Sequence, residues 1–368
     1  MKNNDNIIFF IPSIEGGGVE KNLFIIANYL GKKFSHTKLI TCDRIYNPKF
    51  KQIKVINPKA KVEKFSLRRL KYFFCFIELI KIILNDKNNI VFAFQANLYC
   101  SIICKILGIK VIIRSNSSPS GWKLGFFRKI IFKIFLKLPN KIIVNSKEFQ
   151  IEYRKKFNLK TSCIYNPLNK DHILKLSSEK IKNNFFKNYK YLKIIFIGRL
   201  VDQKDPMTFI KAIDSMKKIN FRALIIGKGV LSNNIKNFIN TQNLQKKVKI
   251  INWQKNPYKF IRSSDVLVLT SKFEGLPNIL LEGICLKKFV ISSNCPTGPK
   301  EILNNGKGGF LFEVGDYEGL RNKLYLYSQK KRKLNNKINF AYKNLSRFDY
   351  KRNLNLYYQE IRGILFEK

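Results

Sequence analysis

The stretch of sequence that decides the fold covers residues 266–282 and reads VLVLTSKFEGLPNILLE. It begins with a short apolar run, Val266–Thr270, and continues with a polar loop and a second apolar segment. A short apolar run with a helical segment behind it is typical of a buried strand in a parallel sheet. Pro277 suits the first turn of that helix, where a backbone donor has no helical partner. The stretch therefore predicts one strand–loop–helix unit of an α/β fold.

The same alternation of apolar runs and helical segments extends in both directions from this stretch. In the first half we expect strands at Ile7–Ile11, Lys38–Cys42, Ile90–Phe94, Val111–Arg114, Lys141–Asn145 and Ser162–Tyr165. In the second half we expect them at Leu192–Gly198, Ala223–Gly227, Val248–Ile251, Val266–Thr270 and Phe289–Ser292. Amphipathic segments such as Gly18–Leu30, Arg69–Leu84 and Phe126–Leu138 lie between the strands of the first half. Buried strands separated by helices predict parallel, doubly wound sheets.

The length of 368 residues, at about 150 residues per domain, predicts two domains. A polar stretch rich in Lys and Asn follows Asn166-Pro167 and is typical of a linker. We therefore expect Rossmann-like domains over 1–168 and 191–345, a linker over 169–190, and a cleft between the two domains. Helical spacing in the tail predicts a closing helix within 346–368 that packs back toward the N-terminal domain.

The charge of the chain is strongly positive. It has 70 Lys and Arg residues against 24 Asp and Glu residues, a formal net charge of +46. Such an excess favours nucleic acid, an anionic membrane surface or phosphorylated substrates as partners. The chain is also rich in Lys, Asn and Ile, so biased codon usage explains the excess equally well. The charge alone does not select a function.

The cysteine pattern and the hydropathy predict a cytoplasmic protein. Seven cysteines form no CxxC pair, so a disulfide framework is not expected. No apolar run approaches the roughly 18 residues needed to span a bilayer. The best run, Tyr72–Leu84, is interrupted by Glu78 and Lys81, and Ile7–Ile11 is too short for a signal peptide. We expect a protein that is free in the cytosol or lies on a membrane surface.

The first motif that carries chemistry is Glu15-Gly16-Gly17-Gly18-Val19-Glu20-Lys21, between the first strand and the first helix. Glycines let backbone amides approach a ligand, and a helix N-terminus favours anions. The spacing is not GxGxxG, so no dinucleotide fingerprint is present. A purely steric reason for the glycines remains an alternative.

The second motif is Gly198-Arg199-Leu200-Val201-Asp202-Gln203-Lys204, at the carboxyl end of a strand. In a doubly wound domain this edge of the sheet faces the ligand crevice. A guanidinium and an ammonium five residues apart are suited to holding two phosphates from one loop. The alternative is that Arg199 and Lys204 are ordinary surface cations of a basic protein.

The third motif is the most specific, Glu274-Gly275-Leu276-Pro277-Asn278-Ile279-Leu280-Leu281-Glu282. Glu282 lies roughly two helical turns beyond Glu274, so the two carboxylates can reach different parts of one ligand. The backbone amides of Asn278 and Ile279 should point toward an anion at the start of the helix. The alternative is a capped helix that carries a solvated acid.

Together the three motifs resemble the family 4 glycosyltransferases of the GT-B fold, and the resemblance covers nearly the whole chain. It rests on Gly-Gly-Gly-Val-Glu, Gly-Arg-x4-Lys and Glu-x7-Glu in this order. Supporting pieces are Ile226–Gly229, Asn252–Pro257 and Ser293–Ile302. The last two look most like bacterial enzymes that add N-acetylhexosamine or galactose during lipid-linked oligosaccharide, O-antigen or capsule assembly.

The resemblance implies a role for each matching residue. Arg199 and Lys204 would hold the diphosphate of a UDP-sugar, Glu274 would bind the donor sugar near the reacting carbon, and Glu282 would bind the ribose. Trp253 and Asn256 belong to a loop that would face the uracil, chiefly through its backbone. The other donor-side positions are Gly17, Gly18, Gly198, Gly227, Gly275, Leu276, Pro277, Asn278 and Ile279. The N-terminal domain would bind a lipid-linked saccharide acceptor, and transfer would retain the anomeric configuration.

The chain departs from many relatives in the first domain. Where they carry a His, this chain reads Arg114-Ser115-Asn116-Ser117-Ser118-Pro119, so Ser115 and Asn116 are the acceptor-side candidates. His36 and His172 make no plausible metal pair, and no Asp-x-Asp occurs. We therefore expect no cofactor and no divalent metal, with Arg199 and Lys204 supplying the positive charge.

A basic amphipathic segment, Gly121–Leu138, predicts contact with a membrane. Lys129, Lys133 and Lys137 align at four-residue spacing, with aromatic and aliphatic residues on the other side. Such a helix can lie in the anionic inner leaflet of the cytoplasmic membrane. A core helix with a wet basic face is the equal alternative.

Three other functions compete with sugar transfer. A nucleic-acid-binding protein would fit the charge, but no RRM, KH or zinc pattern is present, so specific nucleic-acid binding is not expected. A GT-B-fold nucleotide-sugar epimerase would share the motifs but act on a free nucleotide sugar. An inactive scaffold is disfavoured because Arg199, Lys204, Glu274 and Glu282 are all present.

Overall fold

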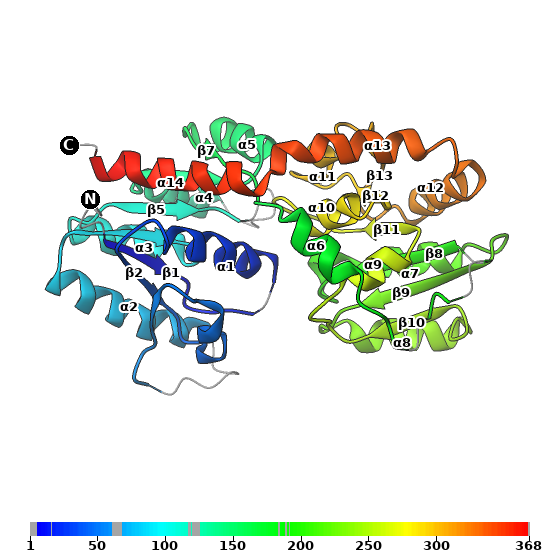
Figure 1. Ribbon diagram of the computed structural model, residues 1–368, viewed down its shortest axis with the longest axis horizontal. Coiled ribbons are helices and arrows are strands. Elements are labelled where there is room, and N and C mark those ends of the chain that lie inside the picture. The colour runs from blue at the N-terminus through cyan, green and yellow to red at the C-terminus, as the bar shows by residue number, and fades with distance from the viewer. Residues whose placement is uncertain are drawn as a thin grey trace. The chain divides into compact units, whose positions relative to one another are not determined.

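The computed structural model describes residues 6–15, 17–60, 68–116, 119, 126–182, 185–187, 190 and 192–366. The chain forms two compact units, each an α/β domain (Figure 1). The first domain comprises 1–167 together with 350–368, and the second comprises 168–349. The prediction of two doubly wound parallel sheets is confirmed.

The first domain is built on a seven-stranded parallel sheet with the order β3-β2-β1-β4-β5-β6-β7. Its strands are β1 (Asn6–Phe10), β2 (His36–Ile40), β3 (Lys54–Ile56), β4 (Asn89–Ala93), β5 (Val111–Arg114), β6 (Lys141–Val144) and β7 (Ser162–Cys163). β1 is an interior strand, in which Phe9 pairs with Leu39 on one side and with Phe92 on the other. Apolar side chains on both faces explain why these strands are almost continuously hydrophobic.

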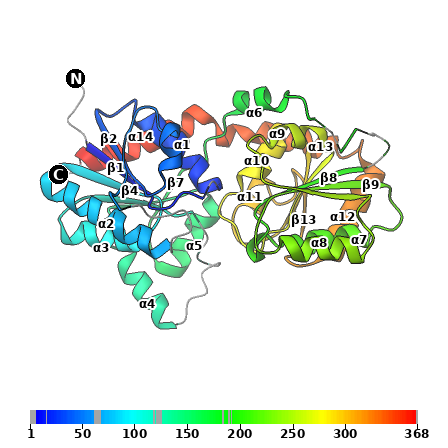
Figure 2. The same ribbon diagram turned by 90° about the horizontal axis from the view of Figure 1, so that it is seen from below.

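Helices cover both faces of this sheet (Figure 2). They are α1 (Gly18–Leu30), η1 (Arg44–Lys49), α2 (Arg68–Asn85), α3 (Asn97–Ile106), α4 (Phe126–Phe135), α5 (Lys147–Phe157) and α14 (Tyr350–Phe366). α1 and α14 pack with Phe9 and Phe92 in one cluster of buried side chains. α2, α3 and α5 pack on the opposite face, around Phe10 and Val91.

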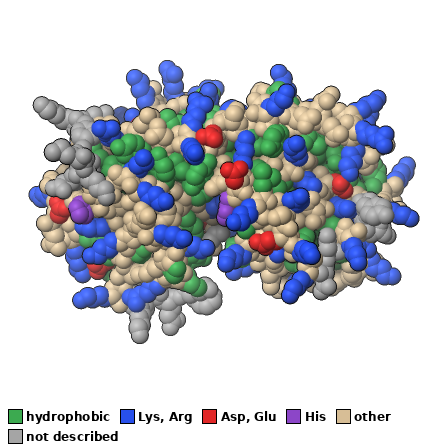
Figure 3. Space-filling view, viewed as in Figure 1, with side chains coloured by type: hydrophobic (Ala, Val, Ile, Leu, Met, Phe, Trp, Pro, Cys, Tyr) green, Lys and Arg blue, Asp and Glu red, His purple; other side chains and the backbone are tan. Residues whose placement is uncertain are grey.

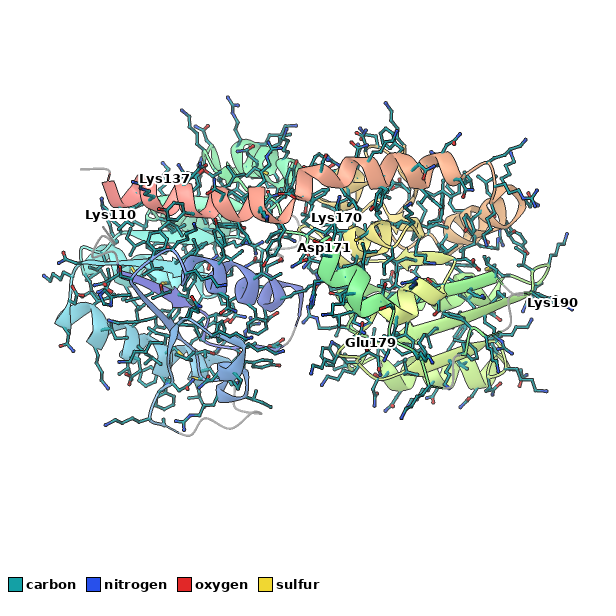
Figure 4. All side chains as sticks on the ribbon, viewed as in Figure 1. Lys110, Lys137, Lys170, Asp171, Glu179 and Lys190 are labelled. Atoms are coloured by element: carbon teal, nitrogen blue, oxygen red, sulfur yellow. The ribbon has the colours of Figure 1, made fainter. Side chains whose placement is uncertain are left out.

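The closing helix α14 completes the first domain. Leu354, Tyr357 and Ile361 are buried in the cluster that contains α1. Lys110 donates from Nζ to the carbonyl of Ile364 over 2.9 Å, and Figure 4 shows Lys110 beside this helix. The expected closing segment 346–368 is divided between the two domains, because the helix begins only at Tyr350.

The second domain has a six-stranded parallel sheet with the order β10-β9-β8-β11-β12-β13. Its strands are β8 (Leu192–Ile197), β9 (Phe221–Ile226), β10 (Val248–Ile251), β11 (Val266–Leu269), β12 (Phe289–Ser293) and β13 (Phe310–Phe312). Its helices are α6 (Lys170–Ser177), η3 (Asp202–Lys204), α7 (Pro206–Asp214), α8 (Ser232–Thr241), α9 (Tyr258–Ser263), α10 (Asn278–Cys285), α11 (Pro299–Ile302), α12 (Tyr317–Lys330), α13 (Asn335–Lys343) and η4 (Asn344–Phe348). Phe196, Phe209 and Val268 lie in its main core.

The stretch 169–190, expected to be a linker, lies within the second domain. Asn169 caps α6 by accepting a hydrogen bond from the amide of His172 over 3.0 Å. Ile173 is buried, and Lys259 forms an ion pair of 3.6 Å with Glu179, which follows α6 (Figure 4). A short capped helix with few apolar residues is difficult to distinguish from a polar linker by composition.

Positive charge predominates on the face of the chain that Figure 3 shows. Figure 3 shows one face, on which Lys and Arg side chains are numerous and Asp and Glu side chains are few. Among the described residues, no helix combines the length and the apolar character that crossing a membrane requires.

Candidate functional site

The candidate site of the second domain lies at the carboxyl edge of its sheet. Gly198 and Arg199 follow β8, Gly227 follows β9, and Thr270 follows β11. In a doubly wound domain, ligands bind outside this edge of the sheet. The topology therefore brings the second and third sequence motifs together, although they are about seventy residues apart in sequence.

Glu274 and Lys204 contact each other directly at this edge. Nζ of Lys204 donates to Oε1 of Glu274, and the Ser271 hydroxyl donates to the same oxygen over 2.7 Å. The two side chains are only 18% and 9% exposed. Because a buried charge is costly without a partner, the contact between the two groups offsets part of the cost of burying both of them. Sequence reasoning assigned them to separate parts of a ligand and did not anticipate this ion pair.

The backbone on either side of Lys204 is also fixed. Lys204 ends η3, and the Thr270 hydroxyl donates to the carbonyls of Lys204 and Asp205 over 2.8 Å each. Asp205 has a φ of +44° and caps α7 through the amide of Thr208. Side-chain hydrogen bonds therefore hold the loop after β8 against the loop after β11.

The loop after β12 holds Glu274 from its other side. The Thr297 hydroxyl donates to the carbonyl of Glu274 over 2.7 Å, although Thr297 has a φ of +60°. A β-branched residue rarely adopts this left-handed backbone conformation, because its Cβ crowds the carbonyl. Gly298 has a φ of +91°, and a Cβ there would lie 2.2 Å from the carbonyl oxygen of Gly275. The surrounding structure therefore holds a strained conformation that fixes the position of Glu274.

Cys295, in the same loop, is a buried thiol beside this carboxylate. Burial raises the pKa of Cys295 to about 12, and the negative charge of Glu274 acts in the same direction. The thiol is therefore neutral at pH 7 and is not suited to act as a nucleophile.

Arg199 differs from Lys204 in being exposed. Its guanidinium donates to Oε1 of Gln203 over 3.2 Å, and Gln203 donates to the carbonyl of Phe273. The glycine before it, Gly198, crosses close to Gly227, where a Cβ would lie 1.9 Å from the carbonyl oxygen of Gly198. Gly227 thus has a steric reason to be glycine in addition to its predicted donor role.

The helix after Glu274 begins one residue later than expected. Asn278 is the first residue of α10, so Pro277 is the N-cap residue rather than part of the first turn. Gly275, Leu276 and Pro277 are buried, whereas Asn278 and Ile279 are partly exposed at the start of the helix. Glu282 is 6% exposed and lies on the buried face of α10.

The loop between β10 and α9 carries Trp253 and Asn256. Trp253 is 57% exposed, so its ring is available to a ligand. The Asn256 side chain donates to the carbonyl of Leu176 and accepts from the amide of Tyr258. This hydrogen bond holds the loop against α6. The stretch that was expected to be a linker therefore helps to position the loop.

In the first domain, Gly17 is the N-cap of α1 and Gly18 its first residue. The buried carboxylate of Glu20 turns back to this end of the helix and accepts from the amide of Glu15 over 3.5 Å. A Cβ on Gly17 would lie 3.0 Å from Oε2 of Glu20. The sequence predicted that backbone amides around Gly17 and Gly18 face a phosphate. The structure places the Glu20 carboxylate at this end of the helix.

Ser115 and Asn116, the acceptor-side candidates, both support neighbouring side chains. The Ser115 hydroxyl is buried and accepts from the Tyr153 hydroxyl over 2.9 Å. The Asn116 side chain donates to the carbonyls of Phe94 and Arg114 and accepts from the guanidinium of Arg114. These contacts stabilise the loop, and direct contact of either side chain with an acceptor stays a prediction.

Arg114 is a buried cation that sequence reasoning did not single out. It is fully buried, and it donates to Oδ1 of Asn116, to the Tyr357 hydroxyl over 2.9 Å and to Oδ1 of Asn166 over 2.6 Å. Its guanidinium also lies over the Phe94 ring. All of these partners are neutral. The signal in the sequence was a cation that ends an otherwise apolar strand, Val111–Arg114.

In the parts of the chain that the structure describes, no cluster of three His, Cys, Asp or Glu side chains is arranged to hold a metal ion. The positive groups at the carboxyl edge of the second sheet include the side chains of Arg199 and Lys204.

The described geometry can be compared with known proteins. Residues 177–344 match the family described as "Glycosyl transferases group 1". An uncharacterized glycosyltransferase of Methanocaldococcus jannaschii, MJ1059, is 34% identical over 245 residues, covering 61% of this chain and 60% of that protein. The N-acetylgalactosamine-N,N'-diacetylbacillosaminyl-diphospho-undecaprenol 4-alpha-N-acetylgalactosaminyltransferase of Campylobacter jejuni is 25% identical over 354 residues, covering 91% of this chain and 92% of that enzyme.

A solved structure shares the whole architecture. The crystal structure of Anabaena HepE in complex with UDP has a TM-score of 0.78 and 16% sequence identity, covering 97% of this chain and all of that one. At this identity the likeness establishes the fold, which is GT-B. The fold and the matches together define the class of this protein: it is a glycosyltransferase. More particularly, the match to the group 1 glycosyl transferases lies in the second domain, over residues 177–344.

The contact between Thr297 and Glu274 generates a stability prediction. Thr297→Val keeps the shape but removes the buried hydroxyl, so we expect it to lower the free energy of unfolding by about 1–3 kcal/mol. Thr297→Ser retains the donor and should lose less. Thr297→Gly should fall between them, because it loses the hydroxyl but relieves the left-handed backbone. Urea denaturation followed by circular dichroism measures the order, and equal stability of the Val and Ser variants would contradict it.

Proposed function

We propose that this glycosyltransferase transfers a sugar from a UDP-sugar to a lipid-linked or surface-polysaccharide saccharide. The favoured donor is UDP-N-acetylgalactosamine, with other N-acetylhexosamines, galactose or glucose as alternatives. We further propose family 4 chemistry, with retention of the anomeric configuration and without a divalent metal. The names of the relatives support the donor and acceptor classes, since the Campylobacter jejuni relative is named for N-acetylgalactosamine transfer to a diphospho-undecaprenol saccharide.

The observation that carries this proposal is the grouping of Arg199, Lys204 and Glu274 at one edge of the second sheet. Arg199 is exposed and Lys204 lies at the buried carboxylate of Glu274. Two cations can bind a diphosphate and stabilise the charge that develops on it as the leaving group departs. A carboxylate beside them can accept hydrogen bonds from sugar hydroxyls. The site thus offers matched chemistry to both halves of a nucleotide sugar.

The Lys204–Glu274 ion pair gives donor binding a specific cost. A diphosphate that engages Lys204 competes with the Glu274 carboxylate for the same ammonium group. Binding therefore weakens the ion pair and leaves Glu274 with the Ser271 hydroxyl and the incoming sugar as partners. In this proposal the donor itself prepares Glu274 for its role near the reacting carbon.

Calorimetric titration with UDP, without metal and beside GDP and ADP, tests the donor site. We expect saturable one-site binding of UDP that Arg199→Ala weakens by about tenfold to a hundredfold, the loss of one charge-assisted contact. Lys236→Ala, which removes an exposed cation from α8, is the matched control and should bind UDP as the unchanged protein does. Absence of binding to every nucleotide would overturn the donor proposal.

Glu274→Gln should separate nucleotide binding from sugar transfer. Neutralising the carboxylate releases Lys204, so we expect UDP to bind several-fold more tightly, while transfer to an acceptor is abolished. Glu318→Gln, at an exposed acid of α12, controls for the change in net charge. Weaker UDP binding in Glu274→Gln would show that the ion pair does not oppose the donor. Interconversion of free UDP-sugar without an acceptor would favour the epimerase alternative.

We also propose that α4 lies on an anionic membrane surface. Ile130, Ile131 and Ile134 are 45%, 48% and 57% exposed, which is unusual for a helix whose only role is to cover a core. Lys133 and Lys137 are exposed beside them. Lys129, the third predicted lysine, has a side chain outside the described ones. Apolar residues flanked by lysines favour the interface of an anionic bilayer, where a lipid-linked acceptor would be found.

Sedimentation with phosphatidylglycerol-containing vesicles tests this assignment. Lys133→Gln with Lys137→Gln should reduce the bound fraction several-fold, because each lysine near an anionic surface contributes about 1 kcal/mol. UDP affinity should not change. The control is Lys32→Gln with Lys351→Gln, two exposed lysines near α1 and on α14, on the other face of the sheet. If both double variants lose the same fraction of vesicle binding, the interaction depends only on the net charge of the protein and not on α4.

A further inference from the structure

Two cysteines of the first domain lie in contact outside the proposed site. Cys42 follows β2 and Cys75 lies on α2, and their sulfur atoms are 3.4 Å apart. Cys42 is partly exposed, whereas Cys75 is fully buried. A disulfide bond is about 2.05 Å long, so the sulfurs would have to approach by only about 1.4 Å. The pair therefore joins a cysteine that is partly exposed to one that is fully buried, with the two sulfur atoms in contact.

The charges around Cys42 favour its thiolate. The hydrogen bond from Cys75 lowers the pKa of the Cys42 thiol, and the cations of Lys71 and Arg44 act in the same direction. Burial and the carboxylate of Asp43 oppose them. The hydrogen bond with Cys42 and, after it, burial raise the pKa of Cys75, so Cys42 is the thiol that ionises first. A thiolate is the nucleophile in thiol oxidation.

We infer that Cys42 and Cys75 form a reversible oxidation site that closes to a disulfide in the presence of a hydroperoxide. The Cys42 thiolate attacks the hydroxyl oxygen of the hydroperoxide and the O–O bond breaks, giving a sulfenic acid. The alkoxide or hydroxide that leaves takes a proton from solvent and becomes an alcohol or water. Sγ of Cys75 then attacks Sγ of Cys42, the S–S bond forms, and water leaves with the Cys75 proton. The two thiols lose two electrons in total, and the hydroperoxide gains them.

The other cysteines are less suited to this reaction. Cys100, Cys104, Cys285 and Cys295 are all buried. Cys163, in β7, is partly exposed like Cys42, which makes it the matched control for accessibility. The combination of an accessible thiol and a buried partner in contact is thus specific to Cys42 and Cys75 among the cysteines, all of which lie in the described part of the chain.

Oxidation at this site should reach the loop that leads to the glycine motif. Asp43, the residue after Cys42, accepts from the amide of Ile14 over 2.8 Å and from the buried ammonium of Lys71 over 2.7 Å. The amide of Cys42 donates to the carbonyl of Pro12 over 3.1 Å. Drawing Cys42 toward α2 therefore strains both contacts with the segment before Gly17. An effect on catalysis through this segment rests on the proposed function.

Mass spectrometry of the full chain tests the oxidation site. After hydrogen peroxide treatment, we expect a loss of two hydrogen atoms in mass before alkylation, two fewer alkylated cysteines after it, and a peptide that links Cys42 to Cys75. Dithiothreitol should reverse these changes. Cys163→Ser should behave like the unchanged protein, while Cys75→Ala should leave a sulfenic acid on Cys42 that dimedone captures. A linkage elsewhere, or over-oxidation of Cys42 with Cys75 still free, would overturn the inference.

A second readout separates the coupling from the proposed function. Sugar transfer by the oxidised protein should fall at least several-fold and return on reduction, while transfer by Cys75→Ala should not fall after the same treatment. A confirmed disulfide with unchanged transfer would refute the coupling to the glycine motif. No transfer by the reduced protein with any UDP-sugar would refute the proposed function, and the mass result would still decide the oxidation site.

Discussion

The ion pair between Lys204 and Glu274 is the interaction on which the rest of the second domain's ligand edge depends. A buried carboxylate needs partners, and Lys204 and Ser271 supply them, while Thr297 holds the backbone carbonyl of the same residue. Lys204 reaches it from the loop after β8, Ser271 from its own loop after β11, and Thr297 from the loop after β12. The loops that follow three neighbouring strands thus all contact one residue. The strained conformation of Thr297 is tolerated because a position shared by three loops leaves little freedom for any of them.

The buried carboxylates of both domains lie in similar places, among the residues that the structure describes. A protein with only 24 Asp and Glu residues needs few of them inside. Those buried among the described residues are Glu20, Asp205, Glu274 and Glu282. Each belongs to a loop or helix that directly follows a central strand, β1, β8 or β11. Among the described residues, the buried carboxylates therefore lie in the segments that follow the carboxyl ends of these strands, where they can organise backbone amides and cations.

Hydrophobic runs predicted most of the fold, because buried parallel strands are apolar on both faces. Val111–Arg114 and Val248–Ile251 were predicted at their observed bounds. β3 and β13 were missed, since a three-residue edge strand has too few positions to show a pattern. The motifs predicted which residues meet at the second sheet's edge. They could not predict that Lys204 and Glu274 pair, nor that Arg114 is buried, because such contacts join loops that are distant in sequence.

The division of the chain between the two domains has a consequence for the order of folding. The second domain is a continuous stretch, 168–349, whereas the first combines 1–167 with α14. During synthesis α14 emerges after the entire second domain. Until then, the side chains of the first domain that α14 covers stay exposed to solvent. Arg114 also lacks one of its hydrogen-bond acceptors during this time, because the Tyr357 hydroxyl belongs to α14. Of the two domains, the one whose synthesis starts first is therefore the last to be completed. Until α14 docks, the guanidinium of Arg114 lacks one of its hydrogen-bond partners.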